Sequence, residues 1–590
     1  MTIGEYRVDE SASGSAPAEL TDQADGAELF VAQLVAAGVE ALYINSGTDT
    51  FPVQEAIARR QALGLAVPRV VLCLDEAVAG AAAHGHYAVT GRPQAVLVHV
   101  DVGTQQIGGA LHNAQRGGAA MLICAGRSPY TIDQGVPGGR SSPIHWQQEQ
   151  LDQHGIVRNY TKWDYQPTRA SMVAPAVQRG LQVAASAPPG PTYLSLPREV
   201  LLERPEQPAL ADPERHAPVP APGPRPELVA RAAAALAASE RPLLLTAMAG
   251  RDPAAVAPLV ELAEALGAPV YANGFRLSIP TTHPLFAGTQ AREAVAEADV
   301  ILAIDTLVPY IPQEVRPAEG AIVIEIDADP LKPTVPLTGF PVDIAIQADP
   351  ALALGELLRA LLQARTEEQA SRAGSRRQAV ERANGERRRG WREAAERKAQ
   401  QAPLAADHVA AVVSEFVDES WTVLDEAVGN SPWVSRMLSR TRPGSLFKSA
   451  GSSLGWALGA AVGVKLAEPA RRVLALVGDG TFVYGCPTAA LWAADVQEAP
   501  FLTLIFNNRM HNATRNALRG AFPESYAQAT GNWPGIRIDP PPDYAALARA
   551  CRAHGETVED PAALPGALER AVAAVEGGQA AVVDVHVAAP

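Results

Sequence analysis

Cysteines are few in this sequence, and long apolar runs are absent. The four cysteines, Cys73, Cys124, Cys486 and Cys551, form no CxxC pair, which argues against a zinc site or a disulfide framework and favours a reducing compartment. No run of about 18 apolar residues is available for a membrane span. The polar, acidic start of the chain lacks the hydrophobic core of a secretion signal. We therefore expect a cytoplasmic protein without a membrane anchor.

Positive charge is also scarce. The sequence has 49 Lys and Arg against 64 Asp and Glu, a net charge of −15, so bulk electrostatics disfavours binding to nucleic acid or to anionic membranes. The chain has 590 residues, 47% of them hydrophobic, which is enough for the cores of three domains of ordinary size. This composition is typical of a large enzyme.

Shifts in composition suggest where the domains begin and end. Residues 1–26 are expected to form a flexible tail. The proline-rich range 206–226 suits an extended linker. The charged range 366–402, which contains Arg387–Arg389, suits a solvated linker helix rather than an RNA-binding segment. The ranges that remain are expected to be three α/β domains: 27–205, 227–365 and 403–590.

Two apolar runs near the carboxyl end predict neighbouring strands. Residues 473–477 and 501–506 are typical of buried parallel strands, and residues 487–496 between them can form a crossover helix. Because such a crossover is right-handed, the two strands should lie side by side. Asp479 and Asn508 are then expected at the carboxyl edge of one sheet, where open α/β sheets bind ligands.

The residue types at this edge suit a hard cation and a phosphate. Asp479, the side-chain oxygen of Asn508 and the backbone carbonyl of Met510 would give Mg²⁺ about half of an octahedral shell, with phosphate oxygens completing it. Gly478 and Gly480 have no Cβ, and the helix that follows offers free N–H groups to an anion. Taken alone, the glycines also fit an ordinary turn in which they relieve steric crowding.

The Gly-Asp-Gly sequence and the paired asparagines together resemble a known motif. Asn508 follows Asp479 by 29 positions, and this spacing resembles the diphosphate-binding motif of thiamine diphosphate (ThDP) enzymes. The resemblance implies that ThDP and Mg²⁺ bind here, with the metal held by Asp479, Asn508 and Met510. The cofactor contacts that it implies in this segment are Gly478, Asp479, Gly480, Thr481, Asn508 and Met510.

A glutamate at the start of an alanine-rich helix matches a second part of the family pattern. Glu76 follows a predicted strand, and its helix leads to Tyr87 and to Thr90–Pro93. In the family, this glutamate is a buried carboxyl that shares its proton with the cofactor's pyrimidine N1′ and so activates C2. Alone, Glu76 also fits an acidic residue favoured in a first helical turn. The chain departs from the family by Asp75, where histidine is commoner, and by one extra residue before Tyr87.

A glycine-rich segment, residues 448–463, precedes the Gly-Asp-Gly strand. The resemblance implies that Leu454 supports the bent conformation of the cofactor and that the backbone carbonyl of Ser452 accepts a hydrogen bond from the 4′-amino group. On its own, Leu454 fits an ordinary core leucine.

Two amino-terminal loops carry candidates for substrate contacts. Thr48 holds the place of a serine that contacts the substrate carboxylate in benzoylformate decarboxylases, although a helix N-cap is the alternative. His99 lies in a loop similar to one in which the histidine of those enzymes sits over the reactive carbon. An imidazole that titrates near neutrality can relay protons; a structural histidine at a strand end is the alternative. His112 and His511 are further candidates for the same cleft.

The whole layout resembles that of acetolactate synthase and benzoylformate decarboxylase. It implies a pyrimidine-binding domain (27–205), a central Rossmann-like domain (227–365) and a diphosphate-binding domain (403–590), each with a parallel sheet. The implied activity is ThDP- and Mg-dependent decarboxylation of a 2-oxo acid or carboligation. In the family the pyrimidine glutamate comes from the neighbouring subunit, which implies an obligate homodimer, and a homotetramer is expected. FAD is not expected, because Ala247–Arg251 is a poor substitute for GxGxxG.

Two alternatives remain open. A 2-hydroxyacyl-CoA lyase or oxalyl-CoA decarboxylase would need a nucleotide site in the central domain, and the sequence identifies none. A ThDP-binding paralogue without turnover would act as a regulatory or assembly subunit, but the presence of Glu76, Asp479 and Asn508 favours catalysis. The donor and acceptor substrates stay open, because fold analogy supplies only the reaction class.

Overall fold

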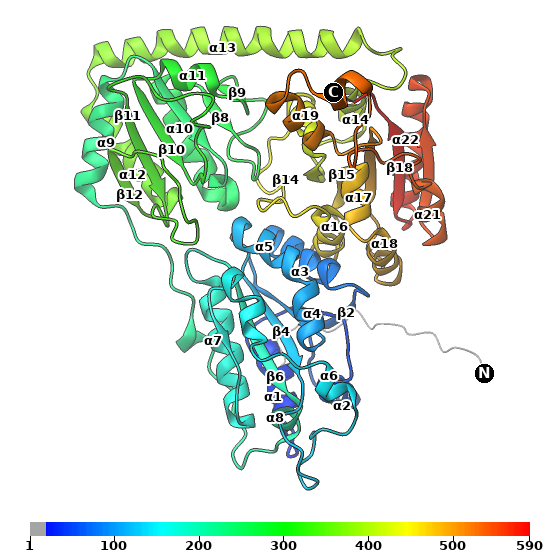
Figure 1. Ribbon diagram of the computed structural model, residues 1–590. Coiled ribbons are helices and arrows are strands. Elements are labelled where there is room, and N and C mark those ends of the chain that lie inside the picture. Colours follow the sequence, from blue (N-terminus) through cyan, green and yellow to red (C-terminus); the bar gives the residue numbers. More distant parts are fainter. Residues whose placement is uncertain (1–18, 590) are drawn as a thin grey trace. The chain divides into compact units, whose positions relative to one another are not determined.

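The computed structural model describes residues 19–589, which contain three six-stranded parallel sheets (Figure 1). The chain forms two compact units that divide between Val219 and Pro220, residues 88–90 excepted. This division falls within the predicted linker 206–226. The first unit contains one sheet, and the second contains the other two.

The first sheet has the strand order β2-β1-β3-β4-β6-β5. Its strands are β1 (Ala41–Ile44), β2 (Arg69–Leu72), β3 (Gln94–Val98), β4 (Met121–Arg127), β5 (Asp164–Tyr165) and β6 (Pro191–Pro197). Its helices are α1 (Gly26–Ala36), α2 (Phe51–Ala62), α3 (Glu76–Thr90), α4 (Val100–Gln106), α5 (Gly108–Gly117), α6 (Ile144–Gln147), α7 (Val173–Ala185) and α8 (Arg198–Leu202). Every residue of β3 and β6 is buried, as expected for the inner strands of a parallel sheet.

The predicted flexible tail is too long at its carboxyl end. Residues 1–18 lie outside the described residues, but α1 already begins at Gly26 and Ala24 is buried. The backbone N–H and the hydroxyl of Thr21 donate to the carboxylate of Glu28 at 2.7 and 2.6 Å, and Asp25 caps the helix. Local capping by polar residues therefore orders a segment whose composition suggested disorder.

The central sheet has the order β12-β11-β10-β7-β8-β9. Its strands are β7 (Pro242–Thr246), β8 (Val270–Ala272), β9 (Phe286–Gly288), β10 (Val300–Ile304), β11 (Ile322–Asp327) and β12 (Ile344–Gln347). Its helices are α9 (Pro226–Ala238), α10 (Val256–Leu266), α11 (Arg292–Glu297) and α12 (Pro350–Ala364). The apolar strands and one face of each long helix form a buried core of this domain.

The third sheet has the order β14-β13-β15-β16-β18-β17. Its strands are β13 (Trp421–Glu426), β14 (Leu446–Phe447), β15 (Arg472–Gly478), β16 (Leu502–Asn507), β17 (His554–Val558) and β18 (Ala581–His586). Its helices are α14 (Ala406–Phe416), α15 (Ser431–Met437), α16 (Trp456–Ala467), α17 (Asp479–Tyr484), α18 (Pro487–Val496), α19 (Asn512–Ala521), α20 (Tyr526–Thr530), α21 (Tyr544–Ala550) and α22 (Leu564–Glu576).

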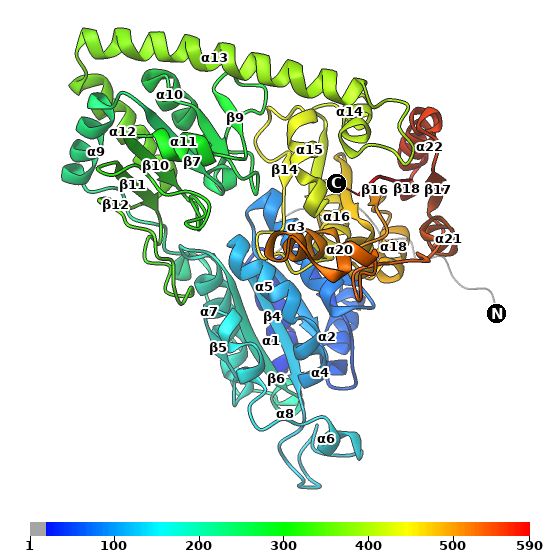
Figure 2. The same cartoon turned by 45° about the horizontal axis from the view of Figure 1, so that its top comes forward.

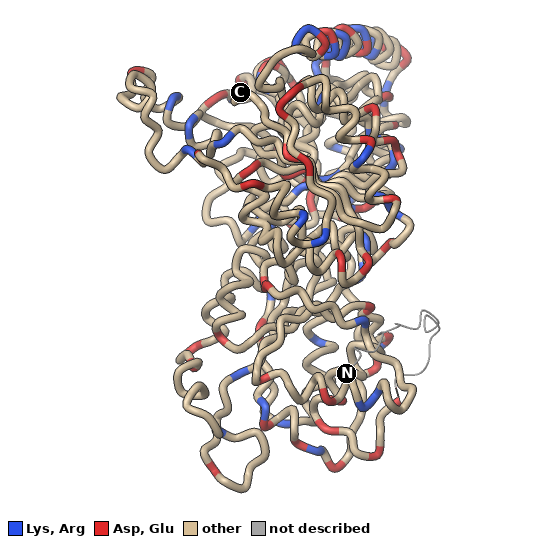
Figure 3. Tube along the Cα trace, turned by 90° about the vertical axis from the view of Figure 1, so that its right-hand side faces the viewer, with Lys and Arg blue, Asp and Glu red and all other residues tan. Residues whose placement is uncertain are grey.

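The charged segment between the second and third sheets forms the 30-residue helix α13 (Glu367–Glu396). A capping box between Thr366 and Gln369 starts it. In Figures 1 and 2 the helix runs from the central domain to the carboxyl-terminal domain, and Figure 3 shows charges of both signs along it. The predicted helix is confirmed. Its basic triplet is not simply solvated, however, because Arg388 donates to backbone carbonyls of the central domain.

In the described part of the chain, none of the helices is both long enough and apolar enough to cross a membrane.

Candidate active site

Three loops meet at the carboxyl edge of the first sheet. Strands β2, β1 and β3 are neighbours and run parallel. Each is followed by a side chain that can carry a proton: Glu76 after β2, Asp49 after β1 and His99 after β3. Parallel strands end on the same side of a sheet, so the strand order brings these three loops together.

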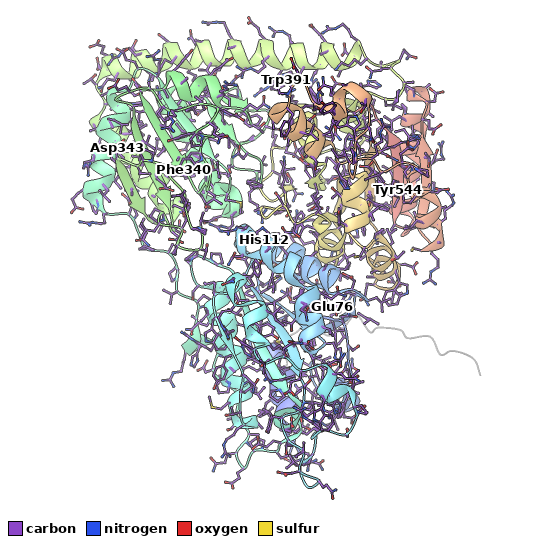
Figure 4. The ribbon with its side chains drawn as sticks, viewed as in Figure 1. Glu76, His112, Phe340, Asp343, Trp391 and Tyr544 are labelled. Atoms are coloured by element: carbon purple, nitrogen blue, oxygen red, sulfur yellow. The ribbon has the colours of Figure 1, made fainter. Side chains whose placement is uncertain are left out.

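Glu76 is the first residue of α3 and is only 7% exposed (Figure 4). Asp75 caps this helix, because its carboxylate accepts a hydrogen bond from the backbone N–H of Val78 at 3.0 Å. The aspartate that departs from the commoner family pattern therefore has a local role. The carboxylate of Glu76 lies beside Gly103, where a Cβ would stand 3.0 Å from Glu76 Oε1. The carboxyl group is thus buried at a helix start, as the sequence predicted.

His99 pairs with an aspartate that sequence patterns did not reveal. Nδ1 of His99 is hydrogen-bonded to Oδ1 of the buried Asp49, and Nε2 of His99 is hydrogen-bonded to Oε1 of Gln148 at 3.1 Å. The other oxygen of Asp49 accepts from the backbone N–H of Val100 at 3.1 Å. The hydrogen bond to Asp49, partly offset by desolvation, raises the pKa of His99 above its ordinary value. Acceptors at both ring nitrogens favour the protonated imidazolium.

Two glycines leave the space that this pair occupies. A Cβ on Gly126, in β4, would overlap the carboxylate of Asp49, and a Cβ on Gly47 would overlap the imidazole of His99. Neither glycine has a positive φ, so space rather than backbone conformation requires them. Both positions are therefore adapted to the Asp49–His99 pair, and their glycines are the one sequence feature connected with it, although their role is visible only in the folded sheet.

Other charged groups face the pair. Asp101, on α4, also raises the pKa of His99. Arg198, on α8, interacts electrostatically with Asp49. His145, on α6, faces both Asp49 and Arg198, and burial lowers its pKa. His99 thus has carboxylates as its nearest charged neighbours, while the cationic groups lie around Asp49.

The remaining amino-terminal candidates are placed differently. Thr48 is exposed in the loop after β1. The N-cap of α2 is Thr50 and not Thr48, so the alternative explanation of Thr48 as a helix cap is wrong. His112 lies on α5 (Figure 4), where its ring meets that of Tyr160 edge to face at 6.0 Å. A substrate role for Thr48 or His112 stays a prediction.

Consecutive strands of the third sheet carry the predicted cofactor residues. In the order β14-β13-β15-β16, the loop with Ser452 and Leu454 follows β14, Asp479 follows β15 and Asn508 follows β16. Strands β15 and β16 pair in parallel, and α18 spans the predicted range 487–496. The predicted strand, helix and strand are therefore confirmed, and Asp479 and Asn508 lie at one edge.

Asp479 begins α17 and is 4% exposed. Its Oδ1 accepts from the backbone N–H of Gly480 at 2.9 Å, whereas its Oδ2 is buried and has no hydrogen-bond partner within the described chain. Burial raises the pKa of this carboxyl, against the lowering effect of the backbone N–H groups of Gly480, Arg509 and Met510 that face it. An ionised oxygen that is buried without a donor is costly, so Asp479 fits the role of a metal ligand.

Asn508 and Met510 place neutral oxygens beside Asp479. Asn508 Oδ1 accepts from the backbone N–H of Met510 at 3.1 Å, and the Met510 carbonyl accepts from that of Asn512 at 2.9 Å. Each oxygen keeps a second lone pair. Residues 19–589 contain no group of three His, Cys, Asp or Glu that could hold a metal. One carboxylate with amide and carbonyl oxygens is a donor set that suits Mg²⁺.

The two glycines of the motif have different surroundings. A Cβ on Gly480 would lie 3.0 Å from His511 Cε1, so packing against His511 disfavours a side chain there. A Cβ on Gly478 would make only an ordinary contact of 3.6 Å with Oγ1 of the buried Thr481. Protein packing therefore does not explain Gly478, whereas close approach of a phosphate would.

A buried glutamate fixes the loop before α16. Glu426, at the end of β13, accepts from three successive backbone N–H groups, Gly455–Ala457, at 3.1, 3.2 and 2.8 Å. Burial raises the pKa of Glu426 to about 7, against the lowering effect of these donors. Ser452 is exposed with a φ of 59°, and Leu454 is half-buried. The glutamate thus holds the start of the helix next to the two predicted cofactor contacts.

Two buried asparagines at this edge were missed by sequence reasoning. Asn430 follows β13, and Asn512 begins α19; they are 2% and 6% exposed. Among the described residues, Asn430 Oδ1 and both polar atoms of the Asn512 side chain have no hydrogen-bond partner. A Cβ on Gly429 would lie 3.6 Å from Asn512 Nδ2. Buried amides normally have partners, so these groups, with Asp479, fit a site for a polar ligand such as a metal-bound diphosphate.

Ion pairs fill the carboxyl edge of the central sheet. Arg251 pairs with Asp305, after β10, at 2.9 Å, and Lys332 pairs with Asp327, at the end of β11, at 3.0 Å. A Cβ on Gly250 would overlap a neighbouring backbone carbonyl, so packing inside the domain requires this glycine. The segment that replaces GxGxxG is therefore accounted for without a dinucleotide.

Three domains of one enzyme family match the chain in order. They are the thiamine pyrophosphate enzyme N-terminal TPP binding domain over residues 24–156, the central domain over 229–357 and the C-terminal TPP binding domain over 427–585. The predicted domain order and the predicted α/β fold of each domain are confirmed.

Individual proteins of known type are similar over most of the chain. A benzoylformate decarboxylase from Pseudomonas aeruginosa is 28% identical over 86% of this chain and 90% of that protein. A probable acetolactate synthase from Mycobacterium bovis is 25% identical over 94% of each. The structure of a thiamine diphosphate-dependent 4-hydroxybenzoylformate decarboxylase from Rhodococcus jostii RHA1 covers 96% of this chain and all of its own, with a TM-score of 0.75 and 23% identity. This last similarity shows the fold.

Proposed function

We propose a reaction for this chain, which belongs to the thiamine pyrophosphate enzyme family of acetolactate synthases and benzoylformate decarboxylases. In the proposed reaction, the enzyme decarboxylates a 2-oxo acid and then either releases an aldehyde or joins the resulting acyl group to a second carbonyl compound. The observation that carries this proposal is the Asp49–His99 pair in the loops next to that of Glu76. It supplies a proton donor at the edge where the family activates its cofactor.

The carboxyl-terminal domain binds the cofactor in this proposal. Asp479, Asn508 and the Met510 carbonyl would hold Mg²⁺, and the unpartnered polar atoms of Asn430 and Asn512 would be available to hydrogen-bond the diphosphate. When bound, the cofactor would supply a nucleophilic carbon, C2, for addition to the 2-oxo carbonyl, and a cationic thiazolium ring that takes up the electron pair left when CO₂ departs.

Other residues contact and orient the cofactor. Gly478, Gly480 and Thr481 contact the phosphates at the start of α17. Leu454 supports the bent conformation, and the Ser452 carbonyl accepts from the 4′-amino group. Glu76 would share a proton with the pyrimidine N1′ from its buried position at the start of α3.

His99 gives a proton to the carbon that has lost CO₂. The hydrogen bonds at Nδ1 and Nε2 favour the imidazolium, and the bond to Asp49 raises the pKa of His99 above its ordinary value. The side chain of Gln148 is hydrogen-bonded to Nε2 of His99, and in the proposed reaction the substrate replaces Gln148 as the partner of this nitrogen. Asp49 fixes the ring through Nδ1, which leaves Nε2 as the donor. The exposed Thr48 hydroxyl, and less directly His112, are the proposed contacts of the substrate itself.

A panel of 2-oxo acids tested with ThDP and Mg²⁺ decides among the candidate functions. Release of CO₂ from at least one acid is expected. Turnover of acyl-CoA donors alone would favour the 2-hydroxyacyl-CoA lyase alternative. That alternative needs a nucleotide site in the central domain, where ion pairs occupy the carboxyl edge of the sheet. Binding of ThDP with no turnover of any compound would favour a non-catalytic paralogue.

We also propose a homodimer as the smallest active unit, assembled into a homotetramer. The family places the pyrimidine glutamate in the neighbouring subunit, which supports this proposal. A cytoplasmic location is proposed as well, since Cys73, Cys124, Cys486 and Cys551 are all free.

Replacing His99 with alanine is expected to slow aldehyde release by about 10²- to 10⁴-fold, because a positioned general acid is lost. Affinity for ThDP should barely change. Aldehyde formation is measured by a coupled assay and cofactor affinity by calorimetry. His216→Ala is the matched control, since His216 is an exposed histidine of the same unit. Wild-type turnover by His99→Ala on every accepted acid would show that His99 is structural.

The variant Asp49→Asn tests the role of the Asp49–His99 pair through the pH dependence of the reaction rate. The isosteric amide removes the charge that raises the pKa of His99, so the pKa of His99 should fall toward the ordinary value of a histidine. Because the acid must be protonated, the loss of rate with rising pH should begin at lower pH in the variant. If the pKa falls by about one pH unit, the variant should be about 10-fold slower on the alkaline side and nearly normal in acid. NMR of the labelled imidazole measures the pKa directly; equal slowing at every pH would contradict this role.

A further inference from the structure

A cavity in the larger unit has no part in the proposed reaction. It has a volume of about 340 Å³ and lies between α13, the loop before β9 and the segment around α15. Four arginines and no acidic residue line it. Its lining consists of Thr281, Thr282, Phe286, Arg388, Arg389, Trp391, Arg392, Ser435, Arg436, Met437, Leu438 and Ser439.

Arg436 is packed against two tryptophan rings at this cavity. Its guanidinium stacks between Trp391 of α13 (Figure 4) and Trp433 of α15, at 5.2 and 4.5 Å from the ring centroids. Within residues 19–589, no hydrogen bond or ion pair joins it to another residue, and burial lowers its pKa. Asp407 is the carboxylate that interacts electrostatically with Arg436, but Asp407 already accepts a hydrogen bond of 2.6 Å from the Lys398 ammonium. The donors of a positioned guanidinium are therefore left for a ligand.

The other arginines add uncompensated positive charge. Arg388 is fixed by bonds of 3.0 Å to the backbone carbonyls of Thr282 and Phe286. Its charged neighbours are themselves arginines, and burial together with their repulsion lowers its pKa. Arg389 and Arg392 are exposed and form no ion pair in the described part of the chain. Gathering like charges costs free energy, which a bound anion would offset.

We propose that this cavity binds a small phosphorylated metabolite. A guanidinium matches the oxygens of a phosphate in a two-pronged geometry, and several arginines favour a ligand with more than one negative charge. The cavity volume lies at the small end of the range of about 300–1,000 Å³ for small-molecule sites. The hydroxyl of the exposed Ser439 provides a neutral donor, whereas those of Thr281 and Ser435 already donate to backbone carbonyls. Because α13 and α15 both contribute, the ligand would brace the linker helix against the carboxyl-terminal domain.

Calorimetry on the enzyme saturated with ThDP and Mg²⁺ tests this proposal, because the diphosphate site is then filled. Inorganic pyrophosphate and ATP are the probes, and citrate is the polyanion without phosphate. We expect the phosphorylated probes to bind more tightly than citrate. No binding by either phosphorylated probe, or equal binding of citrate, would overturn the assignment of a phosphate site.

The double variant Arg389→Ala/Arg392→Ala should weaken binding of the phosphorylated probes by about 10- to 100-fold, the effect of losing charge-assisted hydrogen bonds. These side chains are exposed, so the unfolding temperature without ligand should stay the same. Arg372→Ala/Arg382→Ala removes the same charge from exposed positions of α13 that do not line the cavity. An equal loss in this control would show binding to the helix as a whole and would contradict the proposed site.

Discussion

Replacing Asp479 with alanine is expected to abolish binding of ThDP. The diphosphate is held through a divalent cation, and Asp479 is the one carboxylate in the proposed set of ligands. Its Oδ2 is buried without a hydrogen-bond partner in the described chain, so the variant loses the one charged oxygen ligand and, with it, the Mg²⁺ that neutralises the phosphates. Calorimetry should show tight binding of ThDP to the wild type with Mg²⁺ and none to the variant. The wild type treated with a metal chelator should behave like the variant.

A surface carboxylate of the same domain supplies the control. Asp495 is exposed and pairs with Arg552 on the surface at 2.6 Å. Asp495→Ala removes an equal charge from a side chain outside the proposed ligand set, so its affinity for ThDP should match that of the wild type. Binding of ThDP to Asp479→Ala with unchanged affinity, or metal-independent binding to the wild type, would contradict the cofactor assignment.

Much of the diphosphate half of the site was predictable from the sequence. The apolar runs around residues 475 and 503 are long enough to identify strands β15 and β16, and the crossover rule then brings Asp479 and Asn508 to one edge. Helix α18 has the predicted bounds. These inferences succeed because they depend on local hydrophobic patterns and on a connection of fixed handedness.

The residues that were missed depend on strand order. Asp49 meets His99 because β1 lies next to β3, and no periodicity in the sequence gives that order. Asn430 and Asn512 likewise come from β13 and α19, whose loops meet only in the folded sheet. Long-range contacts were missed in helix α13 as well. The charge pattern around Arg388 predicts a solvated helix, but Arg388 donates to the backbone carbonyls of His283 and Thr282, which are 105 and 106 positions away in the sequence.

Glu76→Gln is expected to leave ThDP bound but to slow exchange of its C2 proton by about 10²- to 10⁴-fold, the range for a lost acid–base group. Glutamine keeps the shape of the side chain and its place at the start of α3, but it cannot share a proton with N1′. NMR of the cofactor in deuterated water measures the exchange rate, and calorimetry measures ThDP affinity. An unchanged exchange rate in the variant would show that another group activates C2.

Mixing two inactive variants tests whether Glu76 acts across a subunit interface. Glu76→Gln retains the metal ligands, and Asp479→Ala retains the glutamate. If each site takes its metal ligands from one subunit and its glutamate from the other, a mixed dimer has one intact site. After unfolding and refolding together in equal amounts, random pairing should restore about a quarter of the wild-type activity. If Glu76 acts within its own subunit, every site in the mixture lacks one function and activity stays absent. Each variant refolded alone is the control, and the result separates the proposed dimeric site from a monomeric one.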